Sequence, residues 1–250
     1  MVKHFIIMAS AYSIGKRIAI DYSSEDELQM NDIKKDIEYI KKECGDDVPI
    51  STHFIQTEDF GWNKVAELDK FFENVELIDT KEKFVIILKK DRVLSGMDVA
   101  RYILTKVPCT HLKLQKLVYM CYAEYLCEFK EKLFDDKIYA YRLGPVIETV
   151  YKRYKKYGSE YIDGEDDTIT YNEIDKKMPI KSRILASEYG LKKIIHIDKT
   201  LEKYSKLSSS DLVKLTHKYS TPWSLSGEGK VTNNEIEDDL IIKYHKYEKL

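Results

Sequence analysis

Gly15 and Lys16 come closest to a phosphate-binding loop. In such a loop a further glycine lies five residues before the Gly-Lys pair's glycine, and Ser or Thr follows the lysine. This chain has Ser10 and Arg17 at those positions, so the backbone cradle and the magnesium ligand are both missing. We therefore predict no nucleotide site here and expect the protein to use no cofactor.

The histidines and cysteines are not spaced as the ligands of a metal site or the residues of a catalytic site would be. The six histidines show no HxxxH or HExxH spacing, and the four cysteines contain no CxxC pair. Cys109 and His111 lie close together, but a zinc site needs a second pair of ligands. There is no GxSxG motif, and nothing identifies a base beside any thiol. We predict no metal site, no enzyme activity, and reduced thiols in a cytoplasmic protein.

Carboxylate pairs and a basic aromatic run have two interpretations each. Asp135-Asp136 and Asp166-Asp167 lie in polar stretches, which favours solvated loops over acid–base pairs. Residues 151–157 alternate tyrosines with Lys and Arg, as grooves for single-stranded nucleic acid do. However, Tyr151 and Tyr154 also continue an apolar helical stripe, which would place the basic residues in solvent. The second interpretation is favoured, although an acidic partner protein could also meet this cluster.

The composition is that of a folded protein. The chain has 250 residues, of which 43% are hydrophobic and 34% charged, and its net charge of −2 makes nucleic acid an unlikely partner. Its 19 tyrosines suit protein interfaces. No apolar run approaches the ~20 residues of a membrane span. Residues 5–8 imitate a signal peptide but are too short, so we predict a buried first strand there.

Residues 1–92 are predicted to form a small α/β accessory domain of no assignable family. Strands are expected at 5–8 and 50–55, and helices from the caps Ser23 and Ser24 to Gly45 and over 62–72. Residues 75–78 and 84–88 resemble a β-hairpin. The charged residues 89–92 and Gly96 mark a boundary.

Helical periodicity dominates from residue 97 to 250, so the predicted fold class is α+β. The clearest helix covers 111–130, and its continuous stripe predicts a central, buried element: Leu114, Leu117, Val118, Cys121, Tyr122, Tyr125, Leu126 and Phe129. Residues 133–143 alternate as in a strand, and Gly144-Pro145 is expected to open a helix. A loop or hairpin is expected at 163–172. Later helices are expected around Leu191–Tyr204 and after Ser208, with a break at 221–224 and a last helix opened by Thr232 and Glu235.

Several of these pieces occur together in one order. They are LKLQKLVY at 112–119, LFDD at 133–136, GPV at 144–146, Thr216-His217 and Pro222-Trp223. This combination resembles the Panacea domain family, the SocA-like antitoxins, over about residues 97–250. The motif residues with expected structural roles are Leu114, Gln115, Leu117, Gly144, Pro145, His217 and Pro222.

The resemblance implies a mostly helical domain that neutralises a toxin encoded next to it, generally by direct contact. It supplies no catalytic residues. A member that delivers its toxin to a protease makes a proteolytic adaptor the alternative, and a nucleic-acid-binding autoregulator is a further one. Exposed Tyr, Trp and Arg are frequent hot spots of protein interfaces. The candidate toxin-binding residues are therefore Tyr141, Arg142, Tyr151, Arg153 and Trp223. Bacterial or phage origin, a role in phage defence and the oligomeric state stay open.

Overall fold

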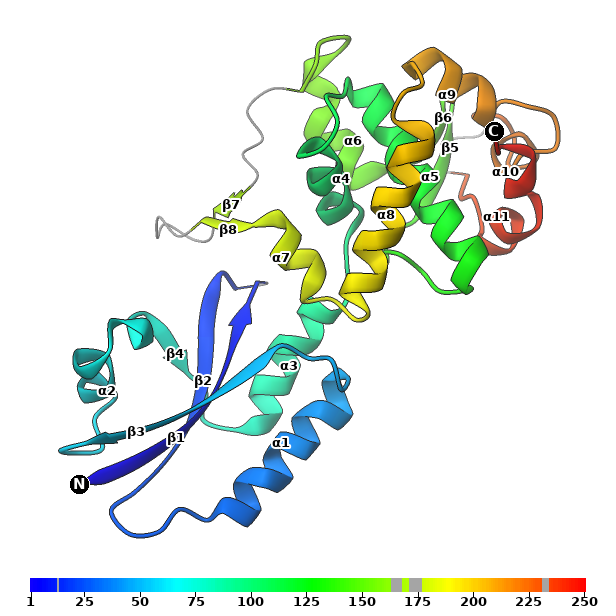
Figure 1. Ribbon diagram of the computed structural model, residues 1–250. Helices are drawn as coiled ribbons and strands as arrows, with labels where there is room; N and C mark the ends of the chain where they lie inside the picture. The colour runs from blue at the N-terminus through cyan, green and yellow to red at the C-terminus, as the bar shows by residue number, and fades with distance from the viewer. Residues whose placement is uncertain (13, 163–167, 171–176, 231–233) are drawn as a thin grey trace. The chain divides into compact units, whose positions relative to one another are not determined.

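The structure is a computed structural model that describes residues 1–12, 14–162, 168–170, 177–230 and 234–250. The chain forms two compact units (Figure 1). The first, the N-terminal unit, comprises residues 1–93 with 170–178 and 186–188. The second, the helical unit, comprises 94–169, 179–185 and 189–250. A sheet-containing unit followed by a mostly helical one confirms the α+β fold class.

The N-terminal unit is built on a four-stranded sheet in the order β3-β1-β2-β4. Its strands are β1 (Val2–Ala11), β2 (Lys16–Ser24), β3 (Ile50–Thr57) and β4 (Val75–Leu77). β1 pairs antiparallel with β2 and β3, and β2 pairs parallel with β4. The helices are α1 (Met30–Cys44), α2 (Trp62–Leu68), the short 3₁₀ helix η1 (Lys70–Phe72) and α3 (Lys81–Arg92).

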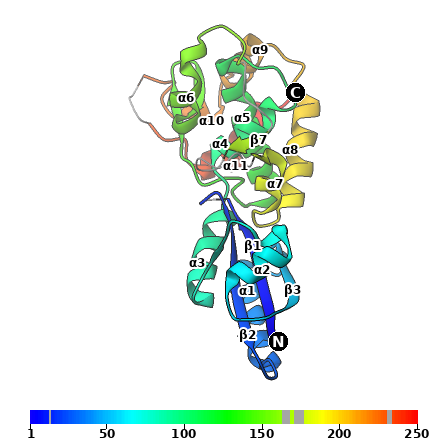
Figure 2. The same ribbon diagram turned by 90° about the vertical axis from the view of Figure 1, so that its left-hand side faces the viewer.

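Helices cover both faces of this sheet. Figures 1 and 2 show α1 and α3 on one face and α2 on the other. Ile7 and Ala9 of β1 belong to the core cluster beneath α1 and α3, whereas Ile6 and Met8 belong to the cluster beneath α2. A strand that is buried on both faces is apolar at consecutive positions. The predicted first strand is therefore confirmed.

Strand β2 was not predicted from the sequence. β2 runs through Ser23 and Ser24, which are not helix caps as expected, and α1 begins only at Met30. Gly15 has φ 64° and lies in the tight connection between β1 and β2, where a left-handed residue is needed. The Gly15-Lys16 pair is thus part of a hairpin turn.

The predicted hairpin at 75–88 is wrong in its second half. β4 is present, but residues 84–88 lie in α3. Phe84, Val85 and Leu88 are buried at helical spacing, and Ile86 between them is exposed. The Thr80 hydroxyl caps the helix by accepting from the Lys83 backbone N–H. Packing of one helical face against the sheet therefore outweighs the β-propensity of this Val-Ile-Ile run.

The helical unit is assembled around α5. Its helices are α4 (Gly96–Leu104), α5 (His111–Phe129), α6 (Glu148–Tyr154), η2 (Lys155–Tyr157), α7 (Ile180–Leu185), α8 (Gly190–Tyr204), α9 (Ser209–Thr216), α10 (Pro222–Leu225), α11 (Asp238–Tyr244) and η3 (His245–Tyr247). Two-stranded sheets are formed by β5 (Ile138–Tyr141) with β6 (Gly144–Ile147) and by β7 (Thr168–Thr170) with β8 (Lys177–Pro179). Most of the predicted loop or hairpin at 163–172 lies outside the described residues.

The predicted central helix is confirmed. Every residue from 114 to 126 is buried, and α4, α6, α8, α9 and α11 surround the helix (Figure 1). Thr110 caps its start by accepting a hydrogen bond from the Lys113 backbone N–H at 3.3 Å. Lys130, in the left-handed conformation, ends it.

Three predictions after residue 140 are corrected. Gly144 and Pro145 open strand β6, not a helix, because they pair with Tyr141 and Ala140 of β5. Residues 221–224 are not a break, since α10 begins at Pro222 with Thr221 as its cap. The last helix begins at Asp238 and not near Glu235, because Glu235 forms an isolated bridge with Tyr139. Thr232 lies outside the described residues.

No helix among the described residues combines the length and the apolar character that crossing a membrane requires.

Candidate protein-binding site

The motif residues of the sequence converge on one structure, the β5–β6 hairpin. Leu114 and Leu117 belong to the buried stripe of α5 and have no exposed surface. Gln115, between them, forms two hydrogen bonds with Ile147 at the end of β6. Its amide nitrogen donates to the Ile147 carbonyl at 3.2 Å, and its amide oxygen accepts from the Ile147 N–H at 2.9 Å. A glutamine amide thus stands in for the peptide group of a neighbouring strand.

The next residue of α5 fixes the start of β6. The Lys116 ammonium is fully buried and donates to the Pro145 carbonyl at 2.9 Å. Pro145 lacks an N–H, so its carbonyl is the backbone group there that needs a partner. Burial lowers the pKa of Lys116 to about 7, although the charge of Glu248 opposes this shift. This side chain is consequently close to losing its charge at neutral pH.

Gly144 is required at the hairpin turn for two independent reasons. Its φ of 104° lies in the region that L-residues rarely adopt. In addition, a Cβ there would lie 2.6 Å from Lys116 Nζ and 2.9 Å from Thr216 Oγ1. The Gly-Pro pair therefore serves close packing against α5 and α9, and not the start of a helix.

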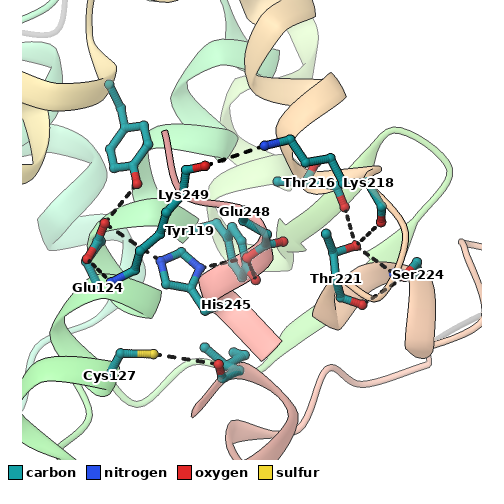
Figure 3. Close-up of polar contacts among 12 residues, drawn as sticks. Tyr119, Glu124, Cys127, Thr216, Lys218, Thr221, Ser224, His245, Glu248 and Lys249 are labelled. Atoms are coloured by element: carbon teal, nitrogen blue, oxygen red, sulfur yellow. Dashed lines mark hydrogen bonds and ion pairs between the residues drawn. The ribbon is translucent and has the colours of Figure 1, made fainter. Parts of the chain in front are cut away.

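Trp223 and His217 support the hairpin from the α9–α10 side. Their rings stack at 3.7 Å between centroids with planes 8° apart. The Trp223 indole N–H donates to the Tyr141 carbonyl at 2.7 Å. Pro222 occupies the first turn of α10, and Thr221 donates its hydroxyl to the Thr216 carbonyl at 2.7 Å (Figure 3). Trp223 is only 6% exposed, so its ring is part of the support and offers little surface to a partner.

The outer side of the hairpin carries the aromatic and basic candidates. The rings of Tyr141 and Tyr151 meet edge-on at 5.7 Å, and His111 lies 6.1 Å from Tyr151. The Tyr141 hydroxyl donates to Glu148 at 3.0 Å. Arg142 is exposed at the turn and forms no hydrogen bond or ion pair among the described residues. Tyr141 and Tyr151 therefore lie together, and Arg142 follows Tyr141 at the turn; these three residues are here called the hairpin surface.

Arg153 is also exposed, and its guanidinium lies 6.0 Å from the Tyr154 ring. Tyr154 itself is only 1% exposed and belongs to the core. A buried ring cannot stack on a nucleic-acid base, which agrees with the helical-stripe interpretation of residues 151–157.

A buried ionic cluster beside the hairpin was not foreseen from the sequence (Figure 3). Glu248 accepts from the Tyr119 hydroxyl at 2.7 Å and contacts His245 Nδ1 at 2.7 Å. Glu124 accepts from the Tyr204 hydroxyl at 2.8 Å and lies 3.1 Å from the Lys249 ammonium. These contacts attach the residues after α11 to the central helix.

The two carboxyl groups of the cluster have pKa values that are shifted in opposite directions. Burial raises the pKa of Glu248 despite the neighbouring His245. Burial also opposes ionisation of Glu124, but the ion pairs with His245 at 3.9 Å and Lys249 at 3.1 Å and the hydrogen bond from Tyr204 outweigh it and hold its pKa well below the usual range. Burial alone would lower the pKa of His245, yet the two glutamates together raise it. Glu124 in the middle of an otherwise apolar stripe was the available sequence signal for this cluster.

The described residues contain no group of three or more His, Cys, Asp or Glu side chains placed to hold a metal ion. The four cysteines are free thiols. Burial raises the pKa of Cys109 to about 12 and raises that of Cys121 as well. Thiols that stay protonated are poor nucleophiles.

Comparison with known proteins agrees with the resemblance seen in the sequence. A family model described as "Antitoxin SocA-like, Panacea domain" matches residues 114–224. A curated relative, Antitoxin SocA of Caulobacter vibrioides (strain NA1000 / CB15N), is 28% identical over 150 residues, which cover 58% of this chain and 76% of the relative. No solved structure matches.

The matched range contains all the motif residues of the hairpin and omits residues 1–113. It is narrower than the predicted range of 97–250. Residues 114–224, which include most of α5, the β5–β6 hairpin and its supports, are therefore the part of the chain that is similar to the Panacea domain of SocA-like antitoxins.

Proposed function

We propose that this protein is an antitoxin that neutralises a partner toxin by binding it directly, with the hairpin surface in contact with the toxin. The Panacea match and the name of the curated relative support an antitoxin role. The choice of surface rests on the contacts that the motif residues make. Gln115, Lys116, Gly144 and Trp223 all hold one short hairpin whose outer side is left to Tyr141, Arg142 and Tyr151.

A rigid hairpin is a suitable platform for a tight complex. Hot spots are enriched in Tyr and Arg and lose little conformational entropy when their surroundings already fix them. Tyr141 is restrained by its hydrogen bond to Glu148 and by the Tyr151 ring. Arg142 has no competing partner among the described residues, so its guanidinium is available for a carboxylate of the toxin.

The proposal is tested by growth rescue. The protein encoded by the neighbouring reading frame is expressed from an inducible promoter with and without this chain. Arrest by the neighbour that this chain relieves is the expected result. A neighbour that is harmless, or that stays toxic in the presence of this chain, would contradict the antitoxin role.

Arg142→Glu is expected to lose protection while the isolated chain keeps its fold, because the reversed charge repels the carboxylate that Arg142 meets. Affinity should fall at least about tenfold, as is usual for a hot-spot charge. Growth rescue and a binding titration measure the effect. Lys206→Glu, a charge reversal at another exposed position of the helical unit, is the control and should rescue like the wild type. Full rescue by a folded Arg142→Glu would remove this residue from the interface.

Toxin abundance during rescue separates two modes of neutralisation. Occlusion of the toxin predicts that its level persists, whereas delivery to a protease predicts that it falls. We propose occlusion, with the complex located in the cytoplasm. The four free thiols support a reducing compartment.

A further inference from the structure

A second surface of the helical unit has the character of a binding groove. It lies between the C-terminal end of α5 and residues 191–199 of α8, with a volume of about 360 Å³. Its walls include Glu128 and Phe129 of α5 and Leu191, Lys192, Ile195 and Lys199 of α8. None of these residues belongs to the hairpin or to its supports.

The floor of the groove is apolar and open to solvent. Leu191 is 63% exposed and Ile195 is 58% exposed, one helical turn apart on α8. Ile194 and Ile197 of the same helix are buried in the core of the unit. α8 therefore carries a second apolar stripe besides the one that packs it onto α5. Two exposed aliphatic side chains beside the half-buried Phe129 form a continuous apolar strip, which is what an amphipathic helix needs from its receptor.

The charged residues that line the groove are Glu128, Lys192 and Lys199. Lys192 lies 2.8 Å from Glu131 and has its ammonium 4.6 Å from the centre of the Phe129 ring. Lys199, two turns along the helix, has no ion pair among the described residues and stands exposed. His196 contributes no charge to the wall, because burial lowers its pKa. Because Lys192 is already paired with Glu131, Lys199 is the lysine of the lining that lacks a countercharge among the described residues.

We propose that this groove binds an acidic amphipathic helix of the partner toxin. The inference rests on the proposed antitoxin function and names the chemistry of the partner at a further contact site. The apolar side chains of that helix cover Leu191, Ile195 and Phe129, and an Asp or Glu side chain meets Lys199. A helix of this kind would bury the exposed strip and supply the countercharge that Lys199 lacks.

The decisive experiment is a titration of the purified full chain with the protein encoded by the neighbouring reading frame. Ile195→Asp places a negative charge in the apolar strip and should raise the Kd at least about tenfold. Ile86→Asp is the matched control, because Ile86 is also an exposed helical isoleucine, at 59%, but lies in the N-terminal unit. The control should bind like the wild type. Circular dichroism confirms that each variant is folded.

Reversing the lysine tests the sign of the partner. Lys199→Glu should weaken binding roughly three- to tenfold, whereas Lys199→Arg keeps the charge and should bind normally. Higher salt should reduce the difference between these two variants.

The outcomes distinguish the two proposals. A wild-type chain that neither binds nor rescues overturns the antitoxin function and the groove together. A wild-type chain that binds while Ile195→Asp binds within twofold overturns the groove alone. Tighter binding by Lys199→Glu shows that the partner surface is not acidic and overturns the groove proposal as well.

Discussion

Gly144 and Lys116 determine at the residue scale how closely the hairpin approaches the central helix. The glycine has no Cβ, and the lysine ammonium occupies the space that a Cβ would need. The lysine in turn is held by the carbonyl of the proline that follows the glycine. Small size, positive φ and a buried donor are therefore combined within one contact.

Gly144→Ala is expected to destabilise the helical unit by about 2–4 kcal/mol, because it adds backbone strain and an overlap with two buried polar atoms. Gly158→Ala is the matched control, since Gly158 also has a positive φ of 55° but has nothing within 4 Å of its would-be Cβ. Its cost should be about 1–3 kcal/mol and should come from strain alone, because its φ of 55° and ψ of −120° suit glycine. Urea unfolding of both variants measures the difference, and equal costs would show that the packing at Gly144 is loose.

Lys116 should make stability depend on pH. Its folded pKa is about 7, whereas a lysine in an unfolded chain titrates near about 10.4. Between these values the unfolded chain binds more protons than the folded one, so stability must rise with pH. His111 and His217 interact electrostatically with Lys116, and both have lowered pKa values. Glu248 is the neighbouring group that favours the charged form of Lys116.

Lys116→Met removes this titration. Relative to the variant, the wild type should gain roughly 1 kcal/mol per pH unit between pH 7 and pH 9.5. Denaturant unfolding at several pH values measures the difference, in which the titrations of other groups cancel. Parallel stability curves for the two proteins would mean that Lys116 stays charged in the folded state.

The importance of an individual residue was predictable from the sequence only where its residue type suits few structural roles. Gly144, Pro145 and Trp223 could be identified as important, but not what each one touches. Gln115 was expected to have a structural role as a motif residue, but its bridge to Ile147 depends on a strand 32 positions away. Glu124 and Glu248 meet through residues from distant helices, and no local pattern encodes that contact.

A helix or strand was predictable from the sequence where its apolar residues recur at a spacing that fits only one kind of element. α5 was predicted because its apolar stripe is continuous and its cap and end are local. α3 was missed because a short Val-Ile-Ile run satisfies strand and helix alike, and only its place on the sheet decides. β6 was missed because Gly-Pro is a good helix start in isolation, whereas here β5 and Gln115 supply strand partners.

The whole molecule contains separate hydrophobic cores. One large cluster fills the helical unit, and two smaller ones lie on the two faces of the N-terminal sheet. The Panacea match covers residues 114–224, which belong to the helical unit except for 170–178 and 186–188. We propose that toxin neutralisation belongs to the helical unit and that residues 1–92 form an accessory domain.

Core truncations should act locally. Ile40→Ala and Leu117→Ala each remove a side chain with no exposed surface, from the N-terminal and the helical unit respectively. Each should cost about 2–5 kcal/mol. Hydrogen exchange should show lost protection within the affected unit, and only Leu117→Ala should impair growth rescue. Loss of rescue by Ile40→Ala with intact protection of α5 would assign the N-terminal unit a direct role.

The supports of the hairpin also have a consequence for the order in which the protein matures. Tyr141 is held by Trp223, 82 positions later, and Gly229 packs against the peptide that joins Tyr141 to Arg142. A growing chain synthesises residues 138–147 well before these supports exist, and contacts of long sequence separation form slowly. The contacts that support the hairpin surface are therefore complete only after residues 223–229 have been synthesised.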